Sequence, residues 1–123
     1  MILDASAILA FLLAELGRER VAEALIEGPT TTTVNFSEVA TKYVPCGAKA
    51  QAATLADRLP LTLVPVDHDL ALRAALMADL MQTAGFSLGD RVCLAFGQRT
   101  GTRCCLPTER GWVWRMRSGF GSR

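Results

Sequence analysis

The sequence opens with MILDASAILAFLLAEL, residues 1–16, and this stretch decides the fold. Residues 1–3 form a short apolar run, which is typical of a buried strand. Residues 6–16 then carry apolar side chains at helical spacing, so the pattern predicts a helix directly after the strand. An acidic residue, Asp4, stands at the junction between the two elements.

The rest of the chain repeats this alternation. The pattern predicts further strands at 31–34, 61–66 and 103–106, and helices at 18–26, 35–44, 48–59, 69–81 and 87–98. Strands that alternate with one or two helices pack as a parallel sheet with helices on both faces. We therefore predict a single α/β domain over residues 1–123. Its fold is a three-layer α/β/α sandwich around a parallel sheet of four or five short strands.

The composition excludes several classes of protein. The 123 residues are 50% hydrophobic and 20% charged, which indicates one ordered domain. No apolar run reaches the roughly 18 residues of a membrane span, and the opening run lacks the basic lead of a signal peptide. We therefore expect a cytoplasmic protein with no membrane partner. Four cysteines without C-x-x-C spacing and a single histidine argue against a zinc site.

The formal net charge of +1 hides a split along the chain. Residues 1–101 hold 8 basic and 11 acidic side chains, whereas residues 102–123 hold 5 basic and 1 acidic. The net charge is thus −3 over the body and +4 over the tail. The body lacks the broad basic surface that is typical of nucleic-acid-binding domains.

Three acidic residues occupy comparable places in the predicted fold. Asp4 follows the first strand, while Glu38 and Asp90 lie in the first turns of predicted helices. The carboxyl ends of parallel strands form one crevice, so we expect these acids to meet there. Glu109, after the last predicted strand, is a candidate fourth acid. Clustered carboxylates repel one another unless a cation joins them, and an all-oxygen site suits Mg²⁺ or Mn²⁺.

Each acid also has a structural interpretation. Asp4 is suited to cap the first helix. Asn35 and Glu38 fit a capping box, and Ser87 and Asp90 fit a looser version of it. The sequence alone leaves both interpretations open for any single acid, and the coincidence of three favours a functional cluster.

Three short motifs resemble one known family. The opening MILDAS (residues 1–6), VNFSEV (residues 34–39) and GFSLGDR (residues 85–91), which is followed by CLA at 93–95, resemble the acidic motifs of PIN-domain endoribonucleases. They are most similar to the toxins of VapBC-type toxin–antitoxin pairs. The resemblance covers about residues 1–101 in order and spacing.

The resemblance implies a metal-dependent ribonuclease that is silenced by a cognate antitoxin. Asp4, Glu38 and Asp90 carry over as the acidic cluster, with Asp4 and Asp90 on Mg²⁺ or Mn²⁺, and Ser6 as a nearby hydroxyl. Where the family carries Thr-Asp-Arg, this chain has Thr108, Glu109 and Arg110, which puts Thr108 beside the site and makes Glu109 a candidate ligand. Structured RNA such as tRNA is the implied substrate. The implied assembly is a homodimer or a toxin–antitoxin hetero-oligomer.

Basic side chains near the predicted site have two interpretations each. Lys42 and Lys49 are solvated helix charges or phosphate contacts. Arg91 either steadies Asp90 or reaches RNA. His68 is expected to be a surface or capping residue and not a base.

The first predicted helix carries more apolar residues than one core-facing side can account for. Leu9, Leu12, Leu13 and Leu16 suggest a groove for the antitoxin or a homodimer contact.

The segment 102–123 departs from the pattern of the rest. One interpretation is a basic tail that grips RNA through Trp112 and Trp114. The interpretation that we favour is a reading-frame slip near residue 101. In the shifted frame Cys104-Cys105 encodes Leu, and later codons permit Thr-Asp-Arg, the family's missing end. That hypothesis predicts a poorly formed last strand and weakened metal affinity.

A second function class stays open beside the nuclease. A catalytically impaired protein-binding module would keep the fold with a damaged final segment. A phosphate-receiver domain fits less well, because it needs an acid pair after the first strand and a late lysine.

Overall fold

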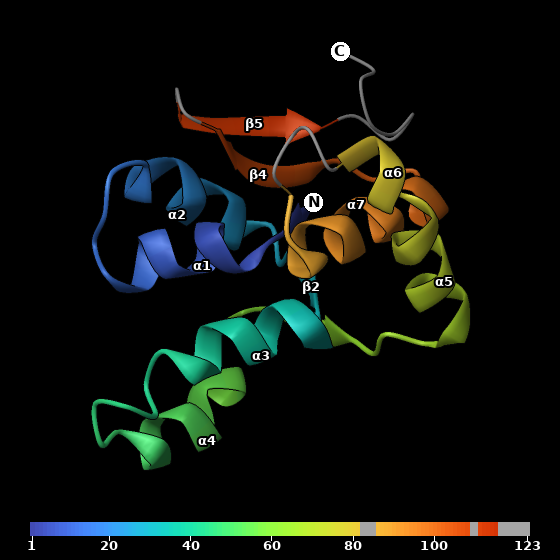
Figure 1. Cartoon of the computed structure of the whole chain (residues 1–123). Helices are drawn as coiled ribbons and strands as arrows, with labels where there is room; N and C mark the ends of the chain where they lie inside the picture. The colour runs from blue at the N-terminus through green and yellow to red at the C-terminus, as the bar shows by residue number, and fades with distance from the viewer. Residues whose placement is uncertain (82–85, 109–110, 116–123) are drawn as a thin grey trace.

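The computed structural model describes residues 1–81, 86–108 and 111–115. Helices alternate with short strands along the chain, as Figure 1 shows. In chain order the elements are β1 (Ile2–Leu3), α1 (Ala5–Leu12), α2 (Arg18–Ile26), β2 (Thr30–Thr32), α3 (Thr33–Thr41), α4 (Lys49–Arg58), β3 (Thr62–Val64), α5 (His68–Leu76), α6 (Ala78–Met81), α7 (Leu88–Thr100), β4 (Cys104–Thr108) and β5 (Gly111–Arg115).

The strands form one sheet in the order β3-β2-β1-β4-β5. The first four run parallel, with Ile2 opposite Thr30 on one side and opposite Cys104 on the other. This confirms the predicted α/β fold with a parallel sheet. The fifth strand, β5, runs antiparallel to β4, so the sheet is parallel over four strands and ends in a hairpin edge.

Side chains that alternate along the strands divide the core in two. Ile2 and Cys104 point to the face covered by α5 and α7. Leu3 and Cys105 point to the opposite face, where α1 to α4 contribute residues such as Val21 and Leu55. The period of two in a strand thus gives the three layers that the sequence predicted.

Two predicted helices are shorter than expected. The helix predicted at 6–16 ends at Leu12, because Ala14 adopts a left-handed conformation with φ of 55° that no α-helix continues. The helix predicted at 69–81 divides at Met77 into α5 and α6. Because α1 ends at Leu12, Leu13 and Leu16 lie outside that helix and are 53% and 96% exposed.

Strand β4, the last strand that the sequence predicted, is well formed, contrary to what the reading-frame hypothesis predicts. β4 pairs with β1 on one edge and with β5 on the other. The predicted strand at 103–106 is therefore extended to Thr108. Trp112 and Trp114 lie in β5 opposite Pro107 and Cys105.

The described helices are all too short or too polar to cross a membrane.

Candidate active site

Asp4 lies at the junction between β1 and α1, as predicted. Its Oδ1 accepts a hydrogen bond of 2.9 Å from the backbone N–H of Ala7, so it caps α1. The residue is 1% exposed, although a carboxylate is rarely buried so deeply without a cationic partner. Ser6 follows in the first turn of α1 and is exposed.

Asp90 lies in the first turn of α7 and closes a capping box with Ser87. The Ser87 N–H donates to Asp90 Oδ2 at 3.0 Å, and the Asp90 N–H donates to Ser87 Oγ at 3.3 Å. The predicted capping interaction between these two residues is confirmed. Like Asp4, this carboxylate is fixed by the N-terminus of a helix.

Glu38 lies in the second turn of α3 and not in the first, so two predictions about it are wrong. The helix begins at Thr33 because Thr32 is the cap: its hydroxyl accepts from the Asn35 N–H at 3.1 Å. The predicted capping box between Asn35 and Glu38 therefore does not form. Thr32 lies three residues before Asn35 in the sequence, and its hydroxyl can cap a helix. This cap was not predicted, because Thr32 was placed in a strand that runs to Val34.

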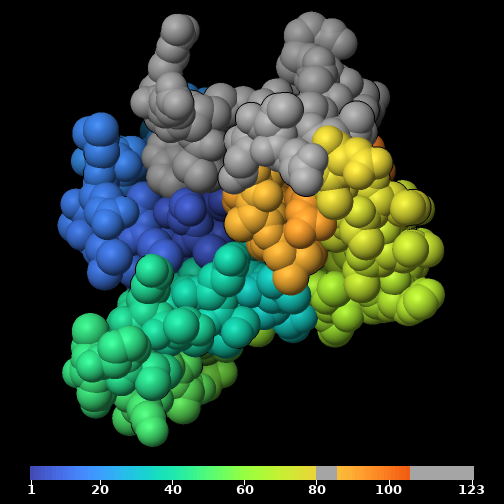
Figure 2. All heavy atoms as spheres, viewed as in Figure 1, coloured from blue at the N-terminus to red at the C-terminus, as the bar shows by residue number. Residues whose placement is uncertain are grey.

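The three acids come together where the N-terminal ends of α1, α3 and α7 meet. Atoms of the first residues, of α3 and of the start of α7 adjoin near the centre of the face in Figure 2. The carboxyl groups of Asp4 and Asp90 are close enough to interact, and the negative charges of both Asp90 and Glu38 raise the pKa of Asp4. The predicted convergence of distant acids is thus what the structure has.

The electrostatics of the site disfavour three ionised carboxylates. Burial, reinforced by the negative charges of Asp90 and Glu38 and opposed by the hydrogen bond from the Ala7 N–H, raises the pKa of Asp4 to about 8. Desolvation also raises the pKa of Glu38, while Asn35 and Lys42 lower it. Glu38 is exposed as a whole residue, so the desolvated part is its carboxyl end, which packs against Gly89 of α7.

The donor set suits a hard divalent cation that keeps water ligands. No group of three or more His, Cys, Asp or Glu side chains among the described residues is close enough to hold a metal alone. Asp4 and Asp90 offer a carboxylate pair, and Mg²⁺ typically binds through one or two carboxylates with several waters. The raised pKa of Asp4 is the second sign of fit, because a cation would supply the missing opposite charge.

The basic residues that were predicted near the site lie in different places in the structure. Lys42 is exposed at the end of α3, close enough to Glu38 to lower its pKa. Arg91 turns the other way, and its Nη1 donates to the Ala74 carbonyl of α5 at 3.0 Å. The guanidinium of Arg91 is thus engaged at the C-terminal turn of α5.

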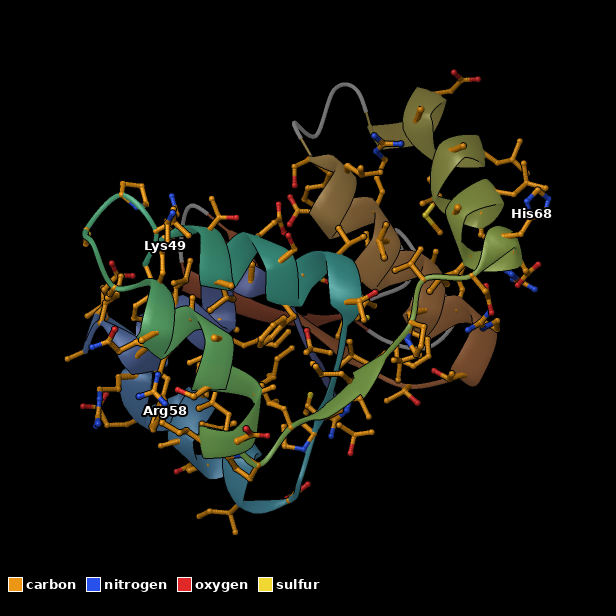
Figure 3. All side chains as sticks on the ribbon, turned by 90° about the horizontal axis from the view of Figure 1, so that it is seen from below. Lys49, Arg58 and His68 are labelled. Atoms are coloured by element: carbon orange, nitrogen blue, oxygen red, sulfur yellow. The ribbon has the colours of Figure 1, made fainter. Side chains whose placement is uncertain are left out.

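Lys49 and His68 lie at opposite sides of the molecule in Figure 3. Lys49 begins α4 and is exposed. His68 begins α5 and is exposed, next to the cap residue Asp67, as predicted for a surface residue. Neither residue lies in the acidic cluster.

The predicted residues at the end of β4 are only partly described. The backbone of Thr108 pairs with Gly111, while its side chain lies outside the described part of the structure. Glu109 and Arg110 lie outside the described residues altogether. β4 does end at the same edge of the sheet as β1, because the two strands are parallel.

The sequence analysis missed the role of Asn35. Its side chain is fully buried and donates to Glu38 Oε1 at 3.4 Å and to the Gly89 carbonyl at 3.1 Å. Its position three residues before Glu38 on one helix face was the available signal. Gly89 was also missed, although it directly precedes the site residue Asp90.

Comparisons with known proteins agree with this fold. No curated protein sequence matches the chain. Two solved structures share the fold. One is a toxin–antitoxin complex from Klebsiella pneumoniae, 15% identical, with a TM-score of 0.64, covering 89% of this chain and 88% of that one. The other is VapC20 from Mycobacterium tuberculosis, described as a sarcin–ricin loop cleaving toxin, 18% identical, with a TM-score of 0.66, covering 81% and 82%.

The sequence profile of the PIN domain matches residues 1–104. The match includes Asp4, Glu38 and Asp90, and it ends within the segment where the charge and composition change. Because the profile spans most of the sequence, the chain belongs to the PIN domain family.

Proposed function

We propose that this PIN-domain protein is a divalent-metal-dependent endoribonuclease and the toxin of a toxin–antitoxin pair. The observation that carries the proposal is the convergence of Asp4, Glu38 and Asp90 at one end of the sheet. A buried acid with two further acids beside it is costly in a purely structural role, since a helix cap needs no second carboxylate near it. The two solved relatives, one a toxin–antitoxin complex and one an RNA-cleaving toxin, support the same assignment.

Each acid has a defined part in this mechanism. Asp4 and Asp90 hold the cation, Mg²⁺ or Mn²⁺, each oriented by the backbone of its own helix. When bound, the cation neutralises charge on the scissile phosphate and lowers the pKa of a water ligand. Glu38, at the edge of the cluster, positions a water for in-line attack and accepts its proton. Hydrolysis of this kind leaves a 3′-hydroxyl and a 5′-phosphate.

The test is RNA cleavage by matched Asp→Asn variants. With Mg²⁺ present, Asp4→Asn and Asp90→Asn should each abolish cleavage of a panel containing total tRNA and a sarcin–ricin loop fragment. Asp67→Asn is the control, because Asp67 also caps a helix but is exposed and pairs with Arg99 at 3.0 Å. Wild-type cleavage by either site variant contradicts the assignment. A folded wild-type chain that binds a partner but cuts no RNA favours the impaired binding module.

The antitoxin is the proposed partner, and an apolar surface beside α1 and α2 is the proposed contact. A cavity of about 560 Å³ opens there, lined by Phe11, Ala22, Leu25, Ile26, Arg58, Leu59 and Pro60. Ile26 is 84% exposed, and Leu13 and Leu16 nearby in the chain are exposed too. Exposed apolar surface of this kind marks a protein contact. Co-expression with the neighbouring small open reading frame should yield a complex, which Ile26→Glu should weaken without loss of nuclease activity.

A homodimer remains the expected form of the free toxin, since two-fold pairing is the commonest assembly of small domains. Three leucines on α5 and α7, Leu72, Leu76 and Leu88, are at least half exposed and offer a second apolar surface. Light scattering of the purified chain tests this expectation, and a monomer at all concentrations contradicts it.

A further inference from the structure

The Asn35 side chain makes three hydrogen bonds within the protein, and both of its donor protons are used. It is fully buried, and its Oδ1 accepts from the Thr32 hydroxyl at 2.7 Å. Its Nδ2 has two protons, and it donates to Glu38 Oε1 and to the carbonyl of Gly89. One amide therefore links the cap of α3, the acid on the next turn of α3 and the first turn of α7, which is 54 residues away in the sequence.

Gly89 leaves the space that the Glu38 carboxylate occupies. A Cβ atom built on Gly89 would overlap both carboxylate oxygens and the Cδ of Glu38. Glycine is a poor helix former, and its usual justification is a positive φ. Gly89 does not have one, unlike Gly17, Gly28, Gly47 and Gly101. Contact with Glu38 is therefore the structural reason for a glycine at this place in α7.

The Glu38 carboxylate needs such an anchor. The residue as a whole is exposed, so its side chain could turn into solvent. Desolvation of the carboxyl end in its present place raises its pKa, and repulsion by the charge of Asp90 raises the pKa too. A flexible, repelled carboxylate would turn toward water. The Asn35 amide and the contact at Gly89 oppose that motion.

We infer that Asn35 and Gly89 are positioning residues, which together hold the carboxylate of Glu38 at the start of α7 beside Asp90. The inference rests on the proposed function, in which Glu38 acts beside the metal-holding pair. Asn35 donates the hydrogen bond that holds the Glu38 carboxylate, and Gly89 leaves the space in which that carboxylate lies. Neither residue needs to touch RNA or metal.

Two variants on different helices test the inference. Asn35→Leu keeps the branched shape and the number of heavy atoms of the side chain, and it removes the hydrogen bonds. Gly89→Ala leaves Asn35 intact, favours the helix and places a methyl group where the carboxylate lies. Thr31→Val is the matched control. It removes an equally buried hydrogen bond, from the Thr31 hydroxyl to the Leu3 carbonyl at 2.7 Å, which does not involve Glu38.

The first readout is RNA cleavage at saturating Mn²⁺ and RNA. Residues that orient metal-site groups typically change metal affinity or activity by about 10- to 100-fold, and we expect kcat of Asn35→Leu and Gly89→Ala to fall by an amount in that range, while KM stays unchanged. Thr31→Val should keep the wild-type kcat, whatever its thermal stability. Binding of Mn²⁺ alone, followed by the electron paramagnetic resonance of the free ion, should change less than kcat, because Asp4 and Asp90 hold the metal. Unchanged kcat in both site variants overturns the inference.

The second readout does not depend on catalysis. Crystal structures of the metal-free variants should show the Glu38 side chain turned away from α7, whereas in Thr31→Val it should stay in place. A Glu38 carboxylate that remains against α7 in Asn35→Leu refutes the positioning role. A wild-type chain that neither binds Mn²⁺ nor cuts RNA refutes the proposed function, and the Glu38 position then still decides on Asn35 and Gly89.

Discussion

Replacement of Asp4 by asparagine should change how the stability of the fold depends on pH. The side chain is buried, and its pKa is raised to about 8 by burial first, and then by Asp90 and Glu38. Asparagine is as good a helix cap as aspartate, so its Oδ1 can keep the hydrogen bond from Ala7. Asp4→Asn therefore removes the titration and preserves the local structure.

The sign of the effect follows from proton binding. The ordinary pKa of an aspartate is 3.8, so between about pH 4 and pH 8 the folded state holds a proton on Asp4 that the unfolded state has lost. The free energy of unfolding then falls as the pH rises through this window, and it is constant above it. A shift of about four units corresponds to a loss of about 5 kcal/mol, which relaxation of the protein and entry of water reduce. For Asp4→Asn the free energy of unfolding should depend less on pH in this window, and its gain in stability over wild type should be largest near pH 8.

Urea unfolding in the presence of a chelator measures this difference. Wild type and Asp4→Asn are compared at intervals from pH 4 to pH 8.5. The control is Asp67→Asn, whose site has the opposite sign: the Leu70 N–H and Arg99 lower the pKa of Asp67, so its contribution is lost as the pH falls. Parallel curves for wild type and Asp4→Asn over this range would refute a protonated, buried Asp4.

Three further predictions follow from other parts of the molecule. At pH 8, Mg²⁺ should raise the thermal unfolding midpoint of wild type and leave that of Asp90→Asn unchanged, as measured by calorimetry. Gly97→Ala should destabilise the fold by about 1–3 kcal/mol in urea unfolding, because the new Cβ would overlap Cys104 Sγ and the Thr102 carbonyl. Sequencing of the DNA that encodes residues 98–123 should decide between a native tail, which the pairing of β4 with β1 and β5 favours, and a reading-frame slip, which requires Leu at the Cys104-Cys105 step and a later Thr-Asp-Arg in the alternative frame. An early stop codon in that frame, or no Asp at that step, contradicts the slip.

The order of elements and the layers were predictable because they depend on periodicity. Ile2 and Leu3 alternate between the two faces, and the helices present apolar stripes, so the pattern itself fixes a sheet covered on both sides. The ends of elements were less predictable, since they depend on single contacts. Ala14 ends α1 by its left-handed conformation, and the Thr32 hydroxyl starts α3 two residues earlier than predicted.

The acidic residues of the site were predictable, whereas the residues that position them were not. Asp4 stands at a strand end, Asp90 in the first turn of α7 and Glu38 in the second turn of α3, and sheet topology brings the first turns after the strands together. Asn35 and Gly89 escaped notice because their role depends on the approach of α3 to α7, which no local pattern encodes. The hairpin strand β5 escaped for the same reason: its register on β4 is a long-range property of a segment with no helical or alternating period.

Capping and catalysis, the two interpretations that the sequence left open for the acids, are compatible in this structure. Asp4 uses Oδ1 to accept from Ala7, and Asp90 uses Oδ2 to accept from Ser87. A carboxylate has a second oxygen, so one atom fixes the side chain to its helix while the other is available to a cation. The helix start thus limits the motion of each ligand without occupying it fully. This explains why acids that cap helices are well suited to a metal site: their orientation is set before the metal arrives, as precise metal sites require.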